Sequence, residues 1–413
     1  MRSSTLSRRS LLQKAAGAAL VGMAVGRPVR AVQGRPIRLG GIWILSGSLA
    51  TYGQFAREGA LMAVDEINAA GGVLGRPLEI RFEDEQNAEV AVRTARRLAL
   101  QEGVDYLIGI DSSGVALAVV REAERLRVPL MVTHAATPQV NTELCNRYTF
   151  RISASVDQNE AAGGRVAAME LRSRRWTTIS PNYAYGHDTW AAFQREFRRV
   201  RDDLQVMDVT AFPPLGAPDF RAHITRIMDA RPEGVMVSLW GGDLVNFLRQ
   251  AKPMGFFDQG FDVVFVLGAA MEVLEAMGKE MPLGYWAGTR YWFLGSDDPV
   301  NVDFYTRFHQ RYGHYPSYNA QTAYAGIYAY KHAIELAGTT DREAVVDALE
   351  RVRFRAPQGE VRFREDHQAM VDVTWGVLAD GGARYPHAIL NPMRRIAAEE
   401  ITPPVSPQCK LAG

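Results

Sequence analysis

The chain has 413 residues, of which 47% are hydrophobic and 23% charged, and its formal net charge is +1. This length and apolar content are sufficient for two domains with large cores. Residues 1–31 carry six basic side chains and no acidic one, which leaves a formal charge of −5 for the remainder. A mildly acidic remainder argues against a nucleic-acid partner, because binding to phosphates needs a basic surface.

The N-terminus has the order of an export signal. The basic start "LSRRSLLQK" precedes a short apolar run, Ala15 to Val25, and then "GRPVRA". The run is too short to span a bilayer but suits a signal-peptide core. The stretch from Ser7 to Leu12 resembles the twin-arginine export signal. We therefore expect residues 1–31 to be a twin-arginine-type signal peptide, cleaved after Ala31, and the mature protein to be soluble and periplasmic, without a lipid anchor.

Two cysteines, Cys145 and Cys409, lie far apart in the sequence. An oxidising compartment allows a disulfide between them. We expect this disulfide, because free thiols are uncommon in exported proteins and no metal or catalytic motif surrounds either residue. The alternative is two unpaired thiols, since the sequence does not give the distance between the two Cα atoms.

Strand and helix patterns alternate from residue 37 onward. In the first helix Ala60, Val64 and Ile67 recur at helical spacing, and Gly71 with Gly72 ends it. The first series of predicted strands covers 37–43, 78–84, 104–110 and 128–133, with helices at 53–70, 88–102 and 115–126. Short strands separated by helices indicate βαβ units, and hence a parallel sheet with helices on both faces.

A second series of similar size follows. Its strands are predicted at 148–153, 175–180, 204–212, 233–240 and 261–268, with helices at 156–171, 187–200, 220–229 and 243–255. Beyond Gly288 the pattern turns mostly helical, with helices at 302–313, 320–338 and 342–352 before strands at 359–365 and 370–378. This late segment is too small for a third domain, so we expect it to complete the first two.

The fold class that follows is α/β, with two doubly wound parallel-sheet lobes joined by a multi-crossover hinge. We assign 36–150 and 289–366 to lobe 1, 151–288 and 367–395 to lobe 2, and 396–413 to a C-terminal tail. The chain should therefore cross between the lobes more than once.

No catalytic signature is found in the sequence. It has no G-x-S-x-G elbow, no P-loop, no G-x-G-x-x-G after the first strand, no H-E-x-x-H and no C-x-x-C. Ser112 and Ser113, between a strand and a helix in "GIDSSGVALAV", have no His or Lys spaced to activate them. We expect a protein that is not an enzyme and holds no cofactor or metal.

Several local strings occur in the order found in one protein family. They are "TYGQFAREGALMAVDEINAAGGVLGRPLEIRFEDEQ", Gly109 with the two serines, "VPLMVTHAATPQV", "YTFRIS", "YAYG" and "FLRQAKPMG". From Ile37 to Asn391 the chain resembles the periplasmic solute-binding proteins of the leucine/isoleucine/valine-binding family. The resemblance implies the type I periplasmic binding fold, a ligand held between two lobes that close by a hinge motion, and delivery to an inner-membrane ABC permease.

The resemblance also implies ligand contacts. The turn before the third helix holds the ligand carboxylate in the family, a role that falls to Ser113, beside Asp111 and Ser112. A helix N-terminus suits this role because its free N–H groups and dipole attract anions. The carbonyl of Ala135 and the side chain of Thr137 are implied at the polar end of the ligand. The implied aromatic contacts are Tyr52, Tyr185 and Trp240.

Each implied contact also has a purely structural explanation. Ser113 is a suitable N-cap, and Thr137 precedes a proline in a turn. Tyr185 and Trp240 are suited to packing between lobes. Trp43, just before the first turn, is expected to belong to the core.

One departure from the family concerns the ligand ammonium. Amino-acid binders of the family carry an acid after the strand aligned with 261–268, where this chain has the uncharged Ala269. Desolvating an ammonium without a counter-charge is costly. Either another acid substitutes, with Asp111, Asp243 and Glu272 as candidates, or the ligand has no ammonium.

We expect a monomeric substrate-binding protein of an ABC transporter. Its ligand would be a small amino acid of branched-chain type, or a related small carboxylate or amide. Two alternatives stay open: a ligand-sensing receptor of the amide-sensor type, which would not need the export signal, and a twin-arginine-exported enzyme, for which no cofactor motif is visible.

Overall fold

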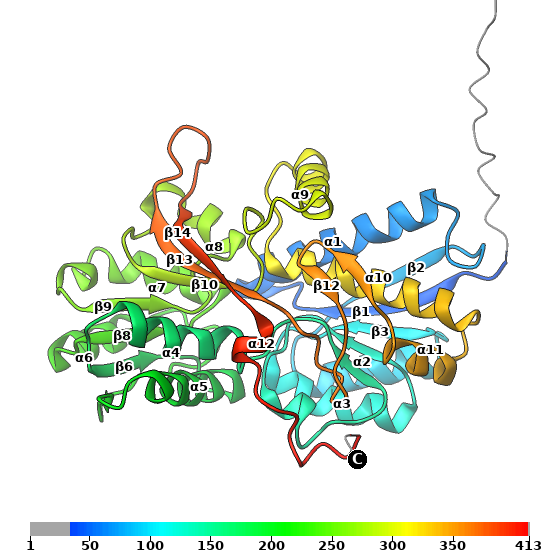
Figure 1. Cartoon of the computed structure of the whole chain (residues 1–413), viewed down its shortest axis with the longest axis horizontal. Helices are drawn as coiled ribbons and strands as arrows, with labels where there is room; N and C mark the ends of the chain where they lie inside the picture. Colours follow the sequence, from blue (N-terminus) through cyan, green and yellow to red (C-terminus); the bar gives the residue numbers. More distant parts are fainter. Residues whose placement is uncertain (1–33, 412–413) are drawn as a thin grey trace, which may run out of the picture.

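The computed structural model describes residues 34–411, and its frame consists of two separate sheets (Figure 1). The predicted signal peptide, residues 1–31, lies outside the described residues. Within the described part of the chain, no helix is long and apolar enough to cross a membrane.

The first sheet has five parallel strands in the order β2-β1-β3-β4-β5. They are β1 (Ile37–Trp43), β2 (Leu78–Asp84), β3 (Tyr106–Gly109), β4 (Leu130–Val132) and β5 (Thr149–Arg151). The connections include the 3-10 helices η1 (Gly47–Leu49) and η2 (Pro138–Asn141), and helices α1 (Ala50–Ala69), α2 (Ala88–Leu100) and α3 (Ser113–Leu126). In β3, Ile108 packs with the core under α1 while Leu107 packs with the core under α2 and α3, so both faces are covered.

The second sheet has seven strands in the order β14-β13-β10-β9-β8-β6-β7. Its parallel strands are β6 (Arg175–Ile179), β7 (Gln205–Val206), β8 (Gly234–Val237), β9 (Asp262–Phe265) and β10 (Trp286–Thr289). Its helices are α4 (Asn159–Glu170), α5 (Ala184–Val200), α6 (Arg221–Ala230), α7 (Gly241–Ala251) and α8 (Met271–Met277). The strands β13 (Val373–Ala379) and β14 (Ile389–Ile396) are added to β10 in antiparallel orientation.

The chain passes repeatedly between the two sheets. After β10 it returns to the first sheet through α9 (Pro299–Tyr312), α10 (Tyr318–Ala337) and α11 (Arg342–Leu349). Helix α10 packs along α1 so closely that a Cβ at Gly59 would lie 2.0 Å from the carbonyl oxygen of Ala320. The hairpin of β11 (Phe354–Ala356) and β12 (Gly359–Val361) then leads to β13. The predicted α/β fold class is confirmed.

The C-terminal segment after β14 runs back toward the first sheet through α12 (Ala398–Ile401) (Figure 1). There Cys409 and Cys145 form a disulfide, with Cα atoms 5.1 Å apart. This distance lies within the range that disulfides require. The bond attaches the C-terminal segment to the loop before β5.

The predicted strand at 204–212 is much shorter in the structure. Only Gln205–Val206 pairs as β7, and Ala211 makes a separate bridge to Ile179. The strands β10 and β14 are not predicted from the sequence. Trp43 is fully buried and donates from Nε1 to the Thr133 hydroxyl at 3.1 Å, as expected of a core residue.

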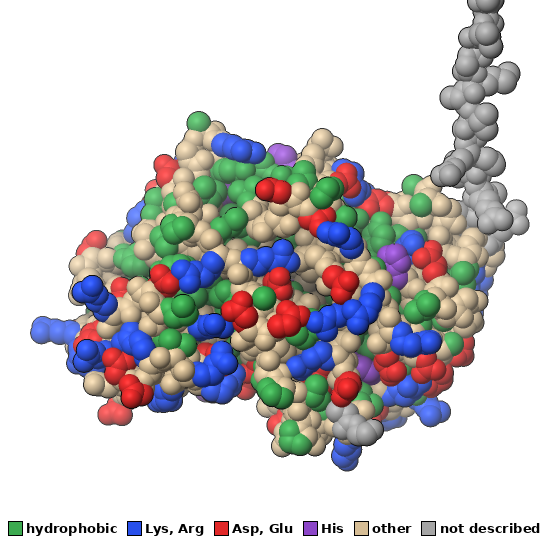
Figure 2. Space-filling view, viewed as in Figure 1, with side chains coloured by type: hydrophobic (Ala, Val, Ile, Leu, Met, Phe, Trp, Pro, Cys, Tyr) green, Lys and Arg blue, Asp and Glu red, His purple; other side chains and the backbone are tan. Residues whose placement is uncertain are grey.

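Charged side chains of both signs are interspersed on the face of the molecule shown in Figure 2. This face therefore has no continuous basic stripe of the kind that a nucleic-acid backbone needs.

Candidate functional site

A small cavity lies where the carboxyl ends of the strands of both sheets face each other. Its free volume is about 10 Å³, close to the space of one water molecule. It is lined by Tyr52, Asp111, Ser113, His134, Ala136, Tyr183, Tyr185, Trp240, Leu267, Arg290 and Tyr318. Open parallel sheets bind ligands at this end of their strands, because the loops that follow different strands converge there.

The turn after β3 carries Asp111 into the cavity wall. Gly109 and Ile110 have φ angles of 127° and 66°, and the latter is a conformation that a β-branched residue seldom adopts. Glu85 holds the turn, because its carboxylate accepts from the amides of Asp111 at 2.6 Å and Ser112 at 2.9 Å. Burial, and then the charge of Asp111, raises the pKa of Glu85 well above its usual range.

Asp111 is held by partners within the protein. Its Oδ2 accepts from the amide of Ile44 at 2.7 Å, and its Oδ1 lies 2.6 Å from Nδ1 of His134. The Nε2 of His134 lies 3.0 Å from the carbonyl oxygen of Asn319. The Nδ1 of His134 also lies 3.0 Å from the hydroxyl of Thr133, so both ring nitrogens are held by oxygen atoms of the protein. Asp111 therefore already has an internal partner.

Ser113 is the first residue of α3, and its hydroxyl connects two turns. Its Oγ accepts from the amides of Ala136 and Thr137, both at 3.1 Å. A hydroxyl has one hydrogen and two acceptor positions. Because both acceptor positions are used, Ser113 has only its hydrogen left for a ligand.

Three predicted contacts lie outside the cavity wall. Ser112 is the N-cap of α3, and its side chain makes no capping hydrogen bond. Ala135 and Thr137 are fully buried, and their carbonyl oxygens accept from Arg151 at 3.4 and 2.6 Å. In this turn Ala136 lines the cavity instead. The structure does bring together the other predicted residues, Tyr52, Asp111, Ser113, Tyr185 and Trp240.

Aromatic side chains enclose the cavity. Trp240 packs on Tyr52 with ring centroids 4.8 Å apart and donates from Nε1 to the hydroxyl of Tyr183 at 3.1 Å. The hydroxyls of Tyr318 and Tyr52 share a hydrogen bond of 2.8 Å. Burial raises the pKa values of Tyr52, Tyr183 and Tyr318, so their hydroxyls keep their hydrogens. The wall therefore combines aromatic rings with protonated hydroxyl groups.

Arg290 directly follows β10 and connects the two halves of the cavity wall. Its Nη1 donates to the carbonyl oxygen of His134 at 2.8 Å, and its Nη2 donates to Oε1 of Glu160 at 2.7 Å. The residue is 2% exposed, and its Nε has no hydrogen-bond partner. Its guanidinium carbon lies 5.4 Å from the ring centroid of Tyr318 and 6.0 Å from that of Tyr185.

The charge of Arg290 is set by two opposing effects. Burial lowers the pKa of the guanidinium, but the carboxylate of Glu160, followed by nearby tyrosine hydroxyls, raises it above its usual value. Tyr185 also donates to Oε1 of Glu160, at 3.2 Å. Arg290 and Glu160 thus form a buried, hydrogen-bonded ion pair beside the cavity.

The other acids considered as ammonium partners do not line the cavity. Asp243 accepts from the amide of Gly216 at 2.8 Å, and burial raises its pKa to about 6. Glu272 accepts from the hydroxyl of Ser317 at 2.6 Å, and burial raises its pKa to about 7. Ala269 is buried and uncharged. Within residues 34–411 no three His, Cys, Asp or Glu side chains are placed to hold a metal ion.

Sequence patterns did not identify six residues of the cavity wall. They are His134, Ala136, Tyr183, Leu267, Arg290 and Tyr318. A signal was present for His134 and Tyr183, which stand in the turns "HAATP" and "YAYG". No such signal was available for Arg290, because the strand before it was not predicted.

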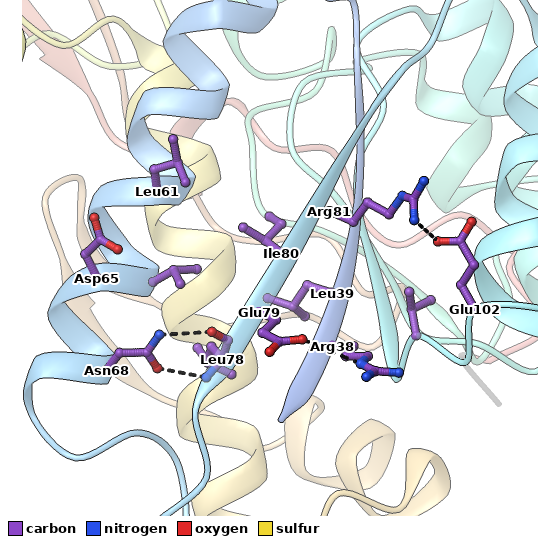
Figure 3. A pocket seen from close by; sticks show the side chains of 12 residues that line it. Arg38, Leu39, Leu61, Asp65, Asn68, Leu78, Glu79, Ile80, Arg81 and Glu102 are labelled. Atoms are coloured by element: carbon purple, nitrogen blue, oxygen red, sulfur yellow. Dashed lines mark hydrogen bonds and ion pairs between the residues drawn. The ribbon is translucent and has the colours of Figure 1, made fainter. Parts of the chain in front are cut away.

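A much larger hollow, of about 680 Å³, lies beside the edge strand β2 (Figure 3). Its charged side chains are all paired: Arg38 with Glu79 at 3.6 Å, Arg81 with Glu102 at 2.8 Å, and Asp65 with Arg311 of α9. Asn68 uses its amide group on the backbone of β2. All its walls come from the first sheet and its helices, and its polar groups are used. We therefore assign the functional site to the cavity between the sheets.

Comparison with known proteins gives a family match over most of the chain. The family model described as "Periplasmic binding protein" matches residues 36–383. A relative from Pseudomonas aeruginosa, the leucine-, isoleucine-, valine-, threonine- and alanine-binding protein, is 26% identical over 334 residues, which cover 78% of this chain and 84% of that protein.

Solved structures show the same fold. An amino acid ABC transporter substrate-binding protein from Pseudomonas fluorescens Pf-5 is 25% identical with a TM-score of 0.77, covering 88% of this chain and 96% of that one. A solute-binding protein of an ABC transporter from Rhodopseudomonas palustris BisB5, in complex with 3,4-dihydroxybenzoic acid, is 22% identical with a TM-score of 0.78. The match covers 88% of this chain and 98% of that one.

Proposed function

The chain belongs to the periplasmic binding protein family, and on this premise we propose that it is the substrate-binding protein of an ABC importer for a small carboxylate. The cavity at the facing ends of the two sheets carries the proposal. Its wall combines Ser113 at a helix N-terminus, the guanidinium of Arg290 and several aromatic rings. Such a wall suits a small anion with an apolar body. The ligands named for the relatives are leucine, isoleucine, valine, threonine and alanine in one case and 3,4-dihydroxybenzoic acid in the other, and all of them have a carboxylate in common.

The proposed cycle requires the two sheets to move apart. A cavity of about 10 Å³ admits no ligand larger than water, and its wall is divided between the sheets. Separation about the crossing segments exposes both halves, and closure buries the ligand between them. In this proposal residues 1–31 direct export to the periplasm, and the closed, monomeric protein presents the ligand to an inner-membrane permease.

A thermal-shift screen of the chain from Val32 onward tests the proposed function. The panel contains branched-chain and polar amino acids, short amides, and aliphatic and aromatic carboxylates. A compound that binds only the folded state stabilises it by RT ln(1 + [L]/Kd), or about 2.7 kcal/mol at a hundredfold excess over Kd. We expect at least one carboxylate-bearing compound to raise the melting temperature in this concentration-dependent manner. A panel without any such compound contradicts the proposal.

A further inference from the structure

Four hydrogen-bond donors of the cavity wall have no partner within the protein. The hydrogen of the Ser113 hydroxyl is free, because its two acceptor positions are taken by amides. The hydrogen of the Tyr183 hydroxyl is free, because its oxygen accepts from an indole N–H that can only donate. Tyr52 and Tyr318 each have one hydroxyl hydrogen. The hydrogen bond between the two hydroxyls uses one of these hydrogens, and the other is free to donate. The fourth donor is Nε of Arg290, which is buried without a partner.

Three backbone carbonyls of the wall are already used as acceptors. The carbonyl oxygen of His134 accepts from Arg290 at 2.8 Å. The carbonyl oxygen of Ala136 accepts from the amide of Val156 at 2.9 Å, and that of Leu267 accepts from the amide of Ala270 at 3.3 Å. A ligand ammonium, which can only donate, finds no free carbonyl at these positions.

The carboxylates near the cavity have partners within the protein as well. Asp111 is paired with His134 and with a backbone amide. Glu160 is paired with Arg290 through Oε1. Its other oxygen, Oε2, has no hydrogen-bond partner, but Glu160 does not line the cavity. The position aligned with the ammonium partner of the family, Ala269, is uncharged. An ammonium group in this cavity would have no counter-charge of its own, which is costly in a buried site.

We propose that the ligand is a carboxylate without an ammonium group, attached to an apolar body, and that Arg290 determines this specificity. This inference rests on the proposed function. The carboxylate accepts from Nε of Arg290 and from the Ser113 hydroxyl at the N-terminus of α3, where the helix dipole adds to the attraction. The apolar body packs between the aromatic rings of the two wall halves. Glu160 is a positioning residue, because it holds Nη2 of Arg290 and leaves Nε for the ligand.

Two matched pairs of probes test the ligand class in the unmodified protein. 4-Methylpentanoate is leucine without its ammonium, and phenylacetate is phenylglycine without its ammonium. Titration calorimetry should show that at least one deaminated acid binds, and that it binds at least about a hundredfold tighter than its amino acid, because the amino acid must bury an unpaired ammonium.

Substitution of Arg290 tests the specificity residue. Arg290→Gln should weaken binding of the tighter acid at least about thirtyfold, as expected for loss of a buried charged donor. The control is Arg249→Gln, which removes an exposed guanidinium that donates to the carbonyl of Ala276. Neither residue lines the cavity, so this variant should leave the affinity unchanged. Arg290→Lys keeps the charge without the donor at Nε and should also weaken binding.

The possible outcomes separate this inference from the proposed function. Tighter binding of the amino acids, or a screen in which only ammonium-bearing compounds stabilise the protein, overturns the inference and leaves the importer function in place. Unchanged affinity in a folded Arg290→Gln protein overturns the role of Arg290. If Arg290→Gln does not fold, the probe pairs still decide the ligand class. Failure of every compound in the screen overturns both proposals.

Discussion

Two adjacent serines at the start of α3 differ in their relation to the cavity. Ser113 lines the cavity and accepts from two amides, whereas Ser112 lies outside the wall and makes no capping bond. The sequence places both in one strand–helix turn and predicts both as ligand contacts. The sequence does not show which of the two serines contacts the ligand, because the direction of each side chain depends on the backbone of the turn. Glu85 fixes that backbone by accepting hydrogen bonds from two of its amides.

This difference predicts different effects of two alanine substitutions. Ser113→Ala should weaken binding of the ligand about tenfold or more, because a hydrogen bond to a charged group is lost. It should also lower stability by about 1–3 kcal/mol, because the amides of Ala136 and Thr137 lose their acceptor. Ser112→Ala should leave the affinity unchanged within about twofold. Titration calorimetry and thermal unfolding measure both quantities, and an equal loss of affinity in the two variants would contradict the assignment.

At the scale of elements, β10 explains why part of the site could not be predicted. The strand has four residues, and a Cβ at Gly288 would lie 2.4 Å from Trp375 of β13. Glycine weakens the sequence signal of a strand, but here it permits close packing of two neighbouring strands. Because this strand was not recognised, Arg290 could not be recognised as a residue at the carboxyl end of a strand.

The strand β14 was missed for a different reason. Its sequence "ILNPMRRI" contains Pro392 and two arginines, and proline within a run argues against a strand. The strand lies at the edge of the second sheet and pairs only with β13, so exposed arginines and a missing N–H are tolerated there.

Helix α7 contacts η1 across the cavity, and a substitution at this contact should weaken ligand binding without preventing folding. A Cβ at Gly242 would lie 2.1 Å from the carbonyl oxygen of Ser48, which belongs to the opposite side of the cleft. Gly242→Ala should therefore obstruct closure and weaken the apparent affinity about tenfold or more, because a smaller fraction of the protein is competent to bind. Its melting temperature without added ligand should change little, because the clash arises only between the two halves.

Gly114→Ala in α3 is the matched control. A Cβ there would make ordinary contacts of 3.7 Å with Ser112 and Tyr183, so the affinity should remain within about twofold of the original. Calorimetric titration of both variants with the same ligand decides the question. Wild-type affinity in Gly242→Ala would show that this contact does not form in the bound state.

At the scale of the whole molecule, the sequence predicts the fold class well. The alternation of short buried strands and amphipathic helices is repeated often enough that the loss of single strands does not change the conclusion. The distribution of hydrogen bonds in the cavity is less predictable. Arg290 and His134, for example, are 156 residues apart and meet only when the two sheets face each other. Export by residues 1–31 and the boundaries of the two lobes stay predictions.

A crystal structure of the protein with the tightest-binding compound of the screen tests the central claim most directly. The account predicts the ligand between the two sheets, with its carboxylate within about 3.2 Å of Oγ of Ser113 and Nε of Arg290 and its apolar body between Tyr52 and Trp240. A ligand in the outer hollow beside β2, or a ligand between the sheets whose ammonium is bound by Asp111, would contradict it.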